Sequence, residues 1–492
     1  MHPRSEKSGS NSWTFPDAAR LDYWIRSYLE KARMRGSVVF LDSQLDGHTA
    51  SRRSYIASDP VLSVRVPSGM RAWETLSEFR RKHPEWMFGW LSYDLKNEIE
   101  SLESANPDPV GLPDMYFFVP GVLLEVDRKG RSIRLIRGHL PTGHPASEYS
   151  PTVHVPPEHY RPEHIPAGPA SPEHIPKGYA PPEHVPCDGT AGKQIPHARP
   201  HPTHEPDSTR SKSGQYSKAR ITSPLTSVDG WERYHRNAEK VKEYIARGDT
   251  YEVNLTHQLQ AGFEGDSLDQ FYAMRDAGPV PFAAWMSHEG IEVCCASPER
   301  FLERDGNRIR SQPIKGTSPR GADPEQDRKI VNDILKKEKN RAENVMIVDL
   351  VRHDMGRVAR TGSVKTEALL EVQTFSTVHQ LVSTITAEVT PNTPSVDIIM
   401  SCFPMGSMTG APKIRTMEII DELESYRRGL YSGAIGYFKP NDDFDFNVVI
   451  RTAIIKGKKL YYPVGGAITA DSDAAEEWEE SWLKARALAV PL

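Results

Sequence analysis

The amino-acid sequence predicts an α+β protein, and two kinds of segment support this prediction. Segments rich in β-branched and aromatic residues, such as 37–42 and 115–126, indicate β-strands. Segments 73–82 and 229–247 have apolar residues at helical spacing and indicate amphipathic helices, the second ending at Gly248. Because hairpins of strands are mixed with helices along the chain, we expect an α+β arrangement.

Proline and histidine content divides the chain into three regions. Fifteen of the forty prolines and eight of the eighteen histidines lie between residues 151 and 206, where Pro-Glu-His recurs four times. Proline at this density removes backbone donors and blocks helices. We therefore expect an N-terminal folded region at 15–138, a disordered linker at 139–227 and a catalytic domain at 228–492. The linker histidines are potential metal ligands, but a low-complexity insertion is the simpler interpretation.

The bulk composition is that of a soluble globular protein. The chain has 492 residues, 38% hydrophobic and 26% charged, with a formal net charge of −5. This small charge does not support a nucleic-acid partner. The four cysteines show neither zinc-type spacing nor a disulfide framework. Because no signal peptide or run of 18 apolar residues occurs, we expect a cytoplasmic protein without a membrane span.

A lysine and a glutamate lie in segments with the character of a binding site. Lys315 follows a short apolar strand end in SQPIKGTSPRG (311–321), where Gly316 allows a ligand close to the backbone. Such a lysine is either a nucleophile with a lowered pKa or a simple anion contact, and composition alone favours the contact. Glu299 in ASPERF becomes interesting only if it faces the same pocket.

Two further segments carry carboxylates or backbone donors. A buried Glu343 costs free energy unless it is paired or metal-bound, and a surface pair with Arg341 or with a neighbouring lysine is the alternative. The glycine-punctuated loop in 404–424 opens a helix at Pro412 and favours an anion, without the spacing of a nucleotide P-loop. The segment 464–488 predicts a helix with an acidic face, which is either solvated or able to present oxygens to Mg²⁺.

Taken in order, these motifs resemble the chorismate-utilising enzymes, the family that includes anthranilate synthase component I, isochorismate synthase and salicylate synthase. The match runs from about 229 to 488, and FGWLSYDL (88–95) is similar to the N-terminal region of the members that aminate chorismate, at C2 or at C4. The resemblance implies an anthranilate synthase component I-like α/β sandwich, with two large antiparallel sheets and flanking helices. The active site would lie between the sheets.

The lysine in PIKGT is similar to that of the members that aminate chorismate at C4, since anthranilate synthases usually have alanine there. The resemblance implies that Lys315 attacks C2 as the C4 hydroxyl leaves, and that ammonia then adds at C4 and expels the lysine. Glu299 would be the general acid and base. The product would be 4-amino-4-deoxychorismate, which leads to para-aminobenzoate and folate.

The same resemblance implies the remaining site residues. Mg²⁺ would be held by Glu343 and Glu480, with Glu477 close by, and would clamp the ring carboxylate. Substrate contacts would come from Arg451 and Tyr431 on the enolpyruvyl carboxylate, from the backbones of Gly316, Thr317 and Gly465, and from His379 at the pocket wall.

Three positions depart from the family pattern. Glu252 stands where isochorismate and salicylate synthases have a lysine that activates water, and where the amide-forming members more often have glutamine. Glu252 therefore argues against water as the nucleophile at C2. His353 and Ala467 are smaller departures, at positions where asparagine and glycine are common.

The resemblance also implies a partner and leaves two alternatives. No cysteine lies in a Gly-x-Cys-x-Gly turn, so a separate glutamine amidotransferase subunit would supply the ammonia. The first alternative is anthranilate synthase component I, which would need ammonia at C2. The second is a non-catalytic chorismate-binding subunit, which has less need of Glu343 and Glu480.

Overall fold

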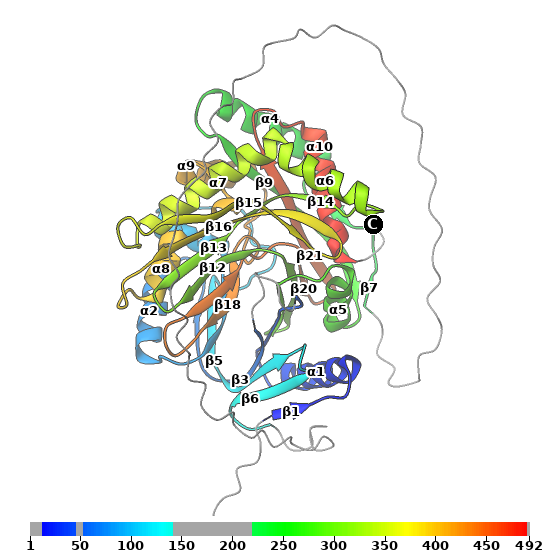
Figure 1. Cartoon of the computed structure of the whole chain (residues 1–492), viewed down its shortest axis with the longest axis vertical. Coiled ribbons are helices and arrows are strands. Elements are labelled where there is room, and N and C mark those ends of the chain that lie inside the picture. The colour runs from blue at the N-terminus through cyan, green and yellow to red at the C-terminus, as the bar shows by residue number, and fades with distance from the viewer. Residues whose placement is uncertain (1–11, 46–52, 141–218, 490–492) are drawn as a thin grey trace, which may run out of the picture. The chain divides into compact units, whose positions relative to one another are not determined.

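Two antiparallel sheets that share a pair of long strands form the framework of the protein (Figure 1). The computed structural model describes residues 12–45, 53–140 and 219–489. Within them, 21 strands are hydrogen-bonded into one continuous network. The shared strands are β3 (Ser54–Val66) and β5 (Met115–Asp127), which pair with each other along their whole lengths.

The first sheet begins at the N-terminal half of β5 and runs in the order β5-β4-β18-β19-β12-β13-β16. Strands β14 and β15 also pair with β16. Their bounds are β4 Met87–Leu91, β12 Arg300–Asp305, β13 Arg308–Gln312, β14 Ile314–Pro319, β15 Lys365–Thr374, β16 Val378–Glu388, β18 Ala434–Phe438 and β19 Phe444–Asn447.

The second sheet uses the other half of the shared strands and runs in the order β6-β5-β3-β2-β10-β11-β20-β21-β9. Strand β1 pairs with β6, and β7, β8 and β17 pair with β9. Their bounds are β1 Ser12–Thr14, β2 Val38–Asp42, β6 Ser132–Arg137, β7 Arg220–Ile221, β8 Thr226–Ser227, β9 Glu252–Glu264, β10 Phe282–His288, β11 Ile291–Ser297, β17 Gly410–Ala411, β20 Thr452–Lys456 and β21 Lys459–Ile468.

The two sheets diverge where both shared strands contain a proline. Pro60 lies opposite Pro120, and the pairing register shifts between Pro60 and Leu62. Neither proline has an N–H to donate, so the ladder is interrupted there. A Cβ atom on Gly121 would lie 2.5 Å from the carbonyl oxygen of Asp59, so the strands approach too closely for a side chain. This irregularity lets one pair of strands serve both sheets.

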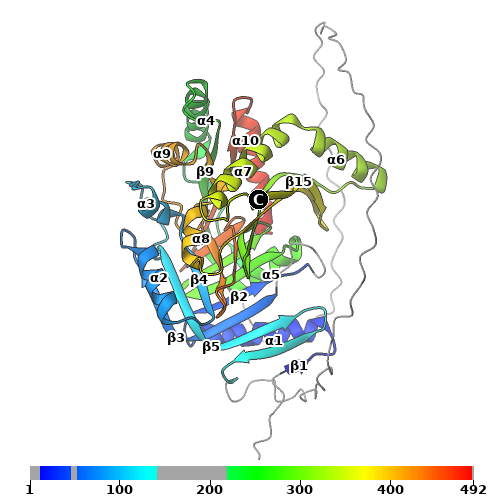
Figure 2. The ribbon, with the colours of Figure 1, turned by 60° about the vertical axis from the view of Figure 1, so that its left-hand side comes forward.

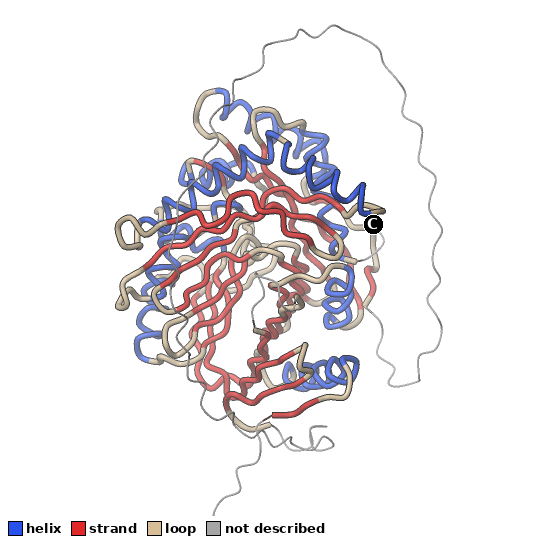
Figure 3. The backbone as a smooth tube through the Cα atoms, in the orientation of Figure 1, coloured by secondary structure: helices blue, strands red, loops and turns tan. Residues whose placement is uncertain are grey.

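Alternation along the strands distributes the core over three layers. In β2, Val39 and Leu41 belong to the core between the sheets, whereas Val38 and Phe40 pack beneath helices. Figure 2 and Figure 3 show helices outside the strands. The second sheet is covered by α1 (Ala18–Arg33) and α5 (Ser267–Ala277), and the first by α2 (Ala72–Lys82), α7 (Glu338–Gly356) and α8 (Ser395–Cys402).

A fourth apolar cluster joins the start of β9 to three helices near the candidate site. These are α4 (Gly230–Ala246), α9 (Lys413–Leu423) and α10 (Ala474–Ala485). The remaining helices are α3 (Lys96–Ile99), α6 (Pro324–Lys336) and the 3₁₀ turns Tyr93–Leu95, Gly406–Met408 and Arg486–Leu488. In the described part of the chain, no helix is both long enough and apolar enough to cross a membrane.

The α+β class and the two antiparallel sheets are confirmed, as are the helices expected at 73–82 and 229–247. The regions 15–138 and 228–492, however, are not separate bodies: β2 pairs with β10, and β4 with β18, within one compact unit. Most of the expected linker, residues 141–218, lies outside the described residues. Its last part forms β7 and β8, which extend the edge of the sheet at β9.

Candidate active site

An irregular strand carries Lys315 into the interior. The register between β14 and β16 shifts between Ile314 and Thr317, so Lys315 and Gly316 form a bulge in the ladder. Gly316 has φ +87°, and a Cβ atom there would lie 3.1 Å from Nδ2 of Asn340. Glycine is therefore required at this position. Thr317 follows at the surface, with Gln380 Nε2 3.5 Å from its Oγ1.

The ammonium group of Lys315 contacts the carboxylate of Glu252, at the first residue of β9. Nζ lies 2.5 Å from Oε1, and both side chains are buried. Burial alone would lower the pKa of Lys315, but the negative charges of Glu252, Glu343 and Glu299 raise it above its ordinary value. Lys315 is therefore protonated in this state and must lose a proton before it can act as a nucleophile.

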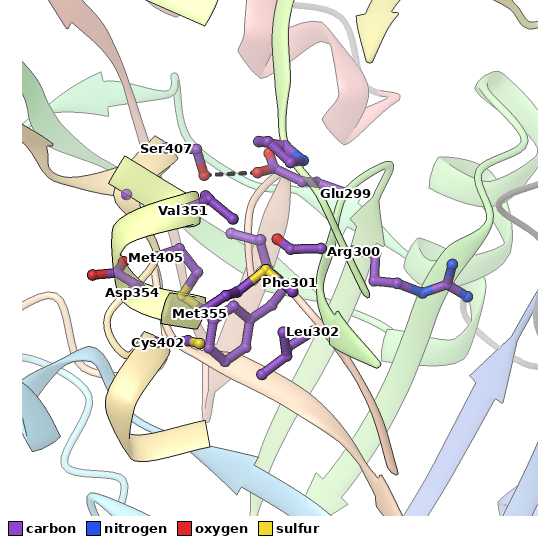
Figure 4. A pocket seen from close by; sticks show the side chains of 14 residues that line it. Glu299, Arg300, Phe301, Leu302, Val351, Asp354, Met355, Cys402, Met405 and Ser407 are labelled. Atoms are coloured by element: carbon purple, nitrogen blue, oxygen red, sulfur yellow. Dashed lines mark hydrogen bonds between the residues drawn. The ribbon is translucent and has the colours of Figure 1, made fainter. Parts of the chain in front are cut away.

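Glu299 lies between β11 and β12 and is held by a hydrogen bond from Ser407, whose Oγ is 2.6 Å from Oε1 (Figure 4). The cavity beside it is lined mainly by apolar side chains, including Val351 and Met355. This burial raises the pKa of Glu299 to about 7, although Ser407, Lys315 and Arg451 act in the opposite direction. A carboxyl group of this kind can donate and accept a proton near neutral pH.

The predicted metal ligands lie on two helices that face each other across Lys339. Its Nζ contacts Glu477 of α10 and lies 3.9 Å from Oε1 of Glu343 on α7. Burial raises the pKa of Glu343 to about 7, and the charges of Glu252 and Glu477 add to this effect. Glu480, one turn further along α10, pairs with Lys484 at 2.9 Å. Glu343 and Glu477 thus share one lysine, whereas Glu480 is paired with another.

Two predicted substrate contacts have the features of an anion site. Arg451 lies between β19 and β20 with φ +50°, a backbone conformation that non-glycine residues rarely adopt. Within the described residues, its guanidinium group has no hydrogen bond or ion pair, and burial lowers its pKa. Tyr431 is buried, which raises the pKa of its phenol. An unpaired guanidinium group suits a carboxylate ligand.

Another predicted contact, His379, is occupied by the protein itself. Both ring nitrogens of His379 are engaged, with Asp327 at 2.8 Å and Thr374 at 2.9 Å. The side chain therefore ties α6 to the first sheet, with no ring nitrogen left for a ligand. Gly465 faces Thr256 in the β21–β9 ladder, and its carbonyl oxygen accepts a hydrogen bond from Lys484.

Sequence reasoning missed three functional neighbours. Glu252 appeared only as a departure from the family pattern, but it is the hydrogen-bond partner of Lys315. Ser407 was part of a loop expected to offer backbone groups, yet its hydroxyl binds Glu299. Lys339 had no signal apart from its position four residues before Glu343, which is the spacing of an ion pair on a helix.

The chain is similar to known proteins in sequence and in fold. Residues 37–490 match the family described as chorismate binding enzyme. The chain is 30% identical to aminodeoxychorismate synthase component 1 of Bacillus subtilis, over 95% of this chain and 94% of that protein. It is 47% identical to aminodeoxychorismate synthase of Streptomyces griseus over 54% of this chain, but it spans 37% of the length of that relative.

A solved structure supports the fold. Anthranilate synthase component I from Streptococcus pneumoniae matches with a TM-score of 0.67 and 23% identity, over 91% of this chain and 94% of that chain. At 23% identity, this similarity supports the arrangement of the sheets and helices alone.

Proposed function

Because the chain belongs to the family of chorismate-binding enzymes, we propose that it aminates chorismate at C4 and forms 4-amino-4-deoxychorismate. The observation that carries this proposal is the lysine of PIKGT, buried in the bulge of β14 with Glu299 close enough to affect its pKa. The full-length relative from Bacillus subtilis, which is named for this reaction, supports it as well.

The proposed reaction is a double displacement with separate roles for two side chains. Lys315 attacks C2, the two ring double bonds shift, and the C4 hydroxyl leaves as water with a proton from Glu299. Ammonia then adds at C4, the double bonds shift back and Lys315 is expelled. Arg451 and Tyr431 hold the enolpyruvyl carboxylate, so that C2 and C4 stay beside the two groups.

We propose that Glu343, Glu477 and Glu480 hold Mg²⁺, which when bound would clamp the ring carboxylate and polarise the substrate. Carboxylate oxygens are the ligands that Mg²⁺ prefers, and Glu343 and Glu477 already share the positive charge of Lys339. Among the described residues, no three acidic or histidine side chains form a ready ligand set. Lys339 and Lys484 would therefore have to give way as the ion binds.

Replacing Lys339 by methionine is expected to strengthen Mg²⁺ binding by about tenfold. The physical reason is that the ammonium group of Lys339 competes for the carboxylates of Glu343 and Glu477. Isothermal titration of Mg²⁺ into the protein without chorismate measures the change. Lys242→Met, on α4 where the ammonium group pairs with Glu239, is the matched control and should bind Mg²⁺ as the unmodified protein does. Weaker binding by the Lys339 variant would contradict the competition.

Replacing Glu299 by glutamine is expected to lower kcat/KM for chorismate by about 10² to 10⁴-fold, the usual contribution of a general acid. In the unmodified enzyme, this rate constant should fall as the pH rises through about 7, because Glu299 loses the proton that it donates. The measurement is a pH profile at saturating free ammonia.

Ser407→Ala is the companion variant for Glu299. It removes a hydrogen bond that lowers the pKa of Glu299, so the fall in rate should move to higher pH. If the pH profile of the variant does not move, the fall in rate is not caused by loss of the proton of Glu299.

The source of ammonia is part of the proposal. The name "component 1" of the Bacillus subtilis relative implies a further subunit, and a glutamine amidotransferase is the chemistry that would release ammonia for C4. A cytoplasmic location, where chorismate and glutamine would both be available, is proposed with it.

The decisive experiment incubates the purified protein with chorismate, Mg²⁺ and an ammonium salt, and identifies products by mass spectrometry with and without an aminodeoxychorismate lyase. We expect 4-amino-4-deoxychorismate, and para-aminobenzoate only when the lyase is added. Anthranilate released without the lyase would assign the chain to the anthranilate-forming members. Chorismate that is bound but not consumed would favour a non-catalytic subunit.

A further inference from the structure

We propose that Glu252 takes the proton from Lys315 before the lysine attacks chorismate, and returns it when the lysine is expelled. This inference rests on the proposed function, because it assigns a role only if Lys315 is the nucleophile. It goes beyond the family resemblance, in which the members that aminate chorismate more often have glutamine at this position.

The contacts of the two side chains support a direct transfer. Glu252 Oε1 lies 2.5 Å from Nζ of Lys315. Among the described residues, Nζ makes no other hydrogen bond. Glu252 is 1% exposed, and its second oxygen, Oε2, is buried without a hydrogen-bond partner there. A buried carboxylate oxygen without a partner lowers the stability of the folded protein. Oε2 of Glu252 is therefore an acceptor that is kept free in spite of this cost.

The position of Glu252 is fixed by the fold and not by the flexible end of a loop. It opens β9, and its Cα faces Ala411 of β17 in the adjoining ladder. Thr250, two residues earlier, donates its hydroxyl to the Glu252 carbonyl oxygen at 3.0 Å. The carboxylate is thus carried by a paired strand, and Lys315 by the bulge of β14 in the other sheet.

Four carboxylates from four elements surround the Lys315 ammonium group. They are Glu252 of β9, Glu343 of α7, Glu299 of the β11–β12 connection and Glu480 of α10. Among them, Glu252 contacts Nζ directly, whereas no ion pair within the described residues joins Lys315 to the other three. The surrounding charge keeps the lysine protonated, so attack requires a proton acceptor, and Glu252 is in position to be that acceptor.

The transfers balance over one turnover. Glu252 takes a proton from the ammonium group, and the free amine bonds to C2 while the C4 hydroxyl leaves as water with the proton of Glu299. Ammonia then bonds to C4, and the C2–N bond breaks with its electron pair returning to Lys315. Glu252 returns its proton to that amine, and Glu299 takes one from the new C4 ammonium group. Both glutamates end as they began, and the net change is chorismate plus ammonia to the amine plus water.

Glu252→Gln tests the inference, because the amide keeps the size and the acceptor oxygen of the side chain but cannot take a proton. At pH 7.5 and saturating free ammonia, kcat should fall about 10²-fold. The ratio of the variant's kcat to that of the unmodified enzyme should then rise by up to tenfold per pH unit, because the free amine must now form by loss of a proton to solvent. The Kd for chorismate, from fluorescence titration without ammonia, should change less than about twofold.

Two further variants make the result decisive. Glu264→Gln, at the half-buried far end of the same strand, should leave kcat and its pH profile unchanged. Glu252→Asp keeps a carboxylate, so its kcat should fall while the ratio to the unmodified enzyme stays constant with pH. Glu252→Asp also tests the inference if the glutamine variant does not fold. A glutamine variant with full activity, or with the same loss at every pH, would overturn the inference, as would an aspartate ratio that rises with pH.

The product of the unmodified enzyme distinguishes a failure of the proposed function from a failure of the role proposed for Glu252. If it is anthranilate, the proposed function fails, whatever Glu252 does. If it is 4-amino-4-deoxychorismate and the glutamine variant shows no dependence of its ratio on pH, the role of Glu252 fails and the proposed function stands.

Discussion

Replacing Lys315 by alanine is expected to lower kcat for the amination of chorismate by at least about 10³-fold, because the variant lacks the group that we propose as the nucleophile, which divides the substitution into two steps. It also leaves the buried Glu252 without its partner, which is a cost to stability as well. The measurement is the rate of 4-amino-4-deoxychorismate formation with saturating ammonia, together with the midpoint of thermal unfolding.

Lys315→Arg is the matched control for this prediction. Arginine keeps a positive charge beside Glu252 but does not lose its proton in proteins, so it cannot attack carbon. If the lysine acts as a nucleophile, the arginine variant should be as inactive as the alanine variant while unfolding at a higher temperature. An arginine variant within tenfold of full activity would show that the positive charge alone suffices.

The second large effect is expected on stability, at the buried pair of Arg428 and Glu424. Both side chains are about 1% exposed, and Arg428 donates to both carboxylate oxygens of Glu424 at 2.6 and 2.9 Å. Glu424→Ala would leave the guanidinium group buried without its counter-charge. The free energy of unfolding in a urea titration should fall by about 3–5 kcal/mol.

Two comparisons show whether the loss comes from the unpaired charge. Replacing both partners, with Glu424→Leu and Arg428→Met, should recover much of the stability, because no charge is then left buried. Glu78→Ala, which removes an exposed pair with Lys82 on α2, should cause no measurable change. A double variant no more stable than Glu424→Ala would point to lost packing instead.

This pair also organises the site. Arg428 donates to the carbonyl oxygens of Met408 and Asn254, both at 2.7 Å, and thereby ties the loop that carries Ser407 to the strand that begins at Glu252. Glu424 accepts from the backbone and hydroxyl of Thr256 on the same strand. We therefore expect the loss of Glu424 to reduce activity even in the fraction that stays folded.

Local patterns in the sequence identified most of the elements. The apolar spacing in 229–247 predicts α4, and the acidic segment 464–488 predicts α10, which Asp473 caps by accepting from the N–H groups of Ala475 and Glu476. The segment after Glu343 belongs to the helix α7, and four of its apolar side chains pack into the core beside the first sheet: Ile347, Val348, Val351 and Met355.

The contacts of the site could not be found in the same way. Lys315 and Glu252 are 63 residues apart, and Lys339 and Glu477 are 138 residues apart, so neither pair leaves a local spacing to recognise. His379 was placed by resemblance at the pocket wall, but nothing in its neighbourhood predicts that Asp327 and Thr374 occupy its ring. Such contacts follow from the pairing of strands that are distant in sequence.

The two shared strands have a consequence for how the polypeptide becomes a folded protein. Because β3 and β5 contribute hydrogen bonds to both sheets, neither half of the chain can complete a sheet before the other is made. A fragment that starts at residue 228 would present the unpaired edges of β10 and β18, which are templates for aggregation. Folding must wait for contacts between distant parts of the chain, so we expect it to be slow and to gain little from N-terminal segments made first during translation.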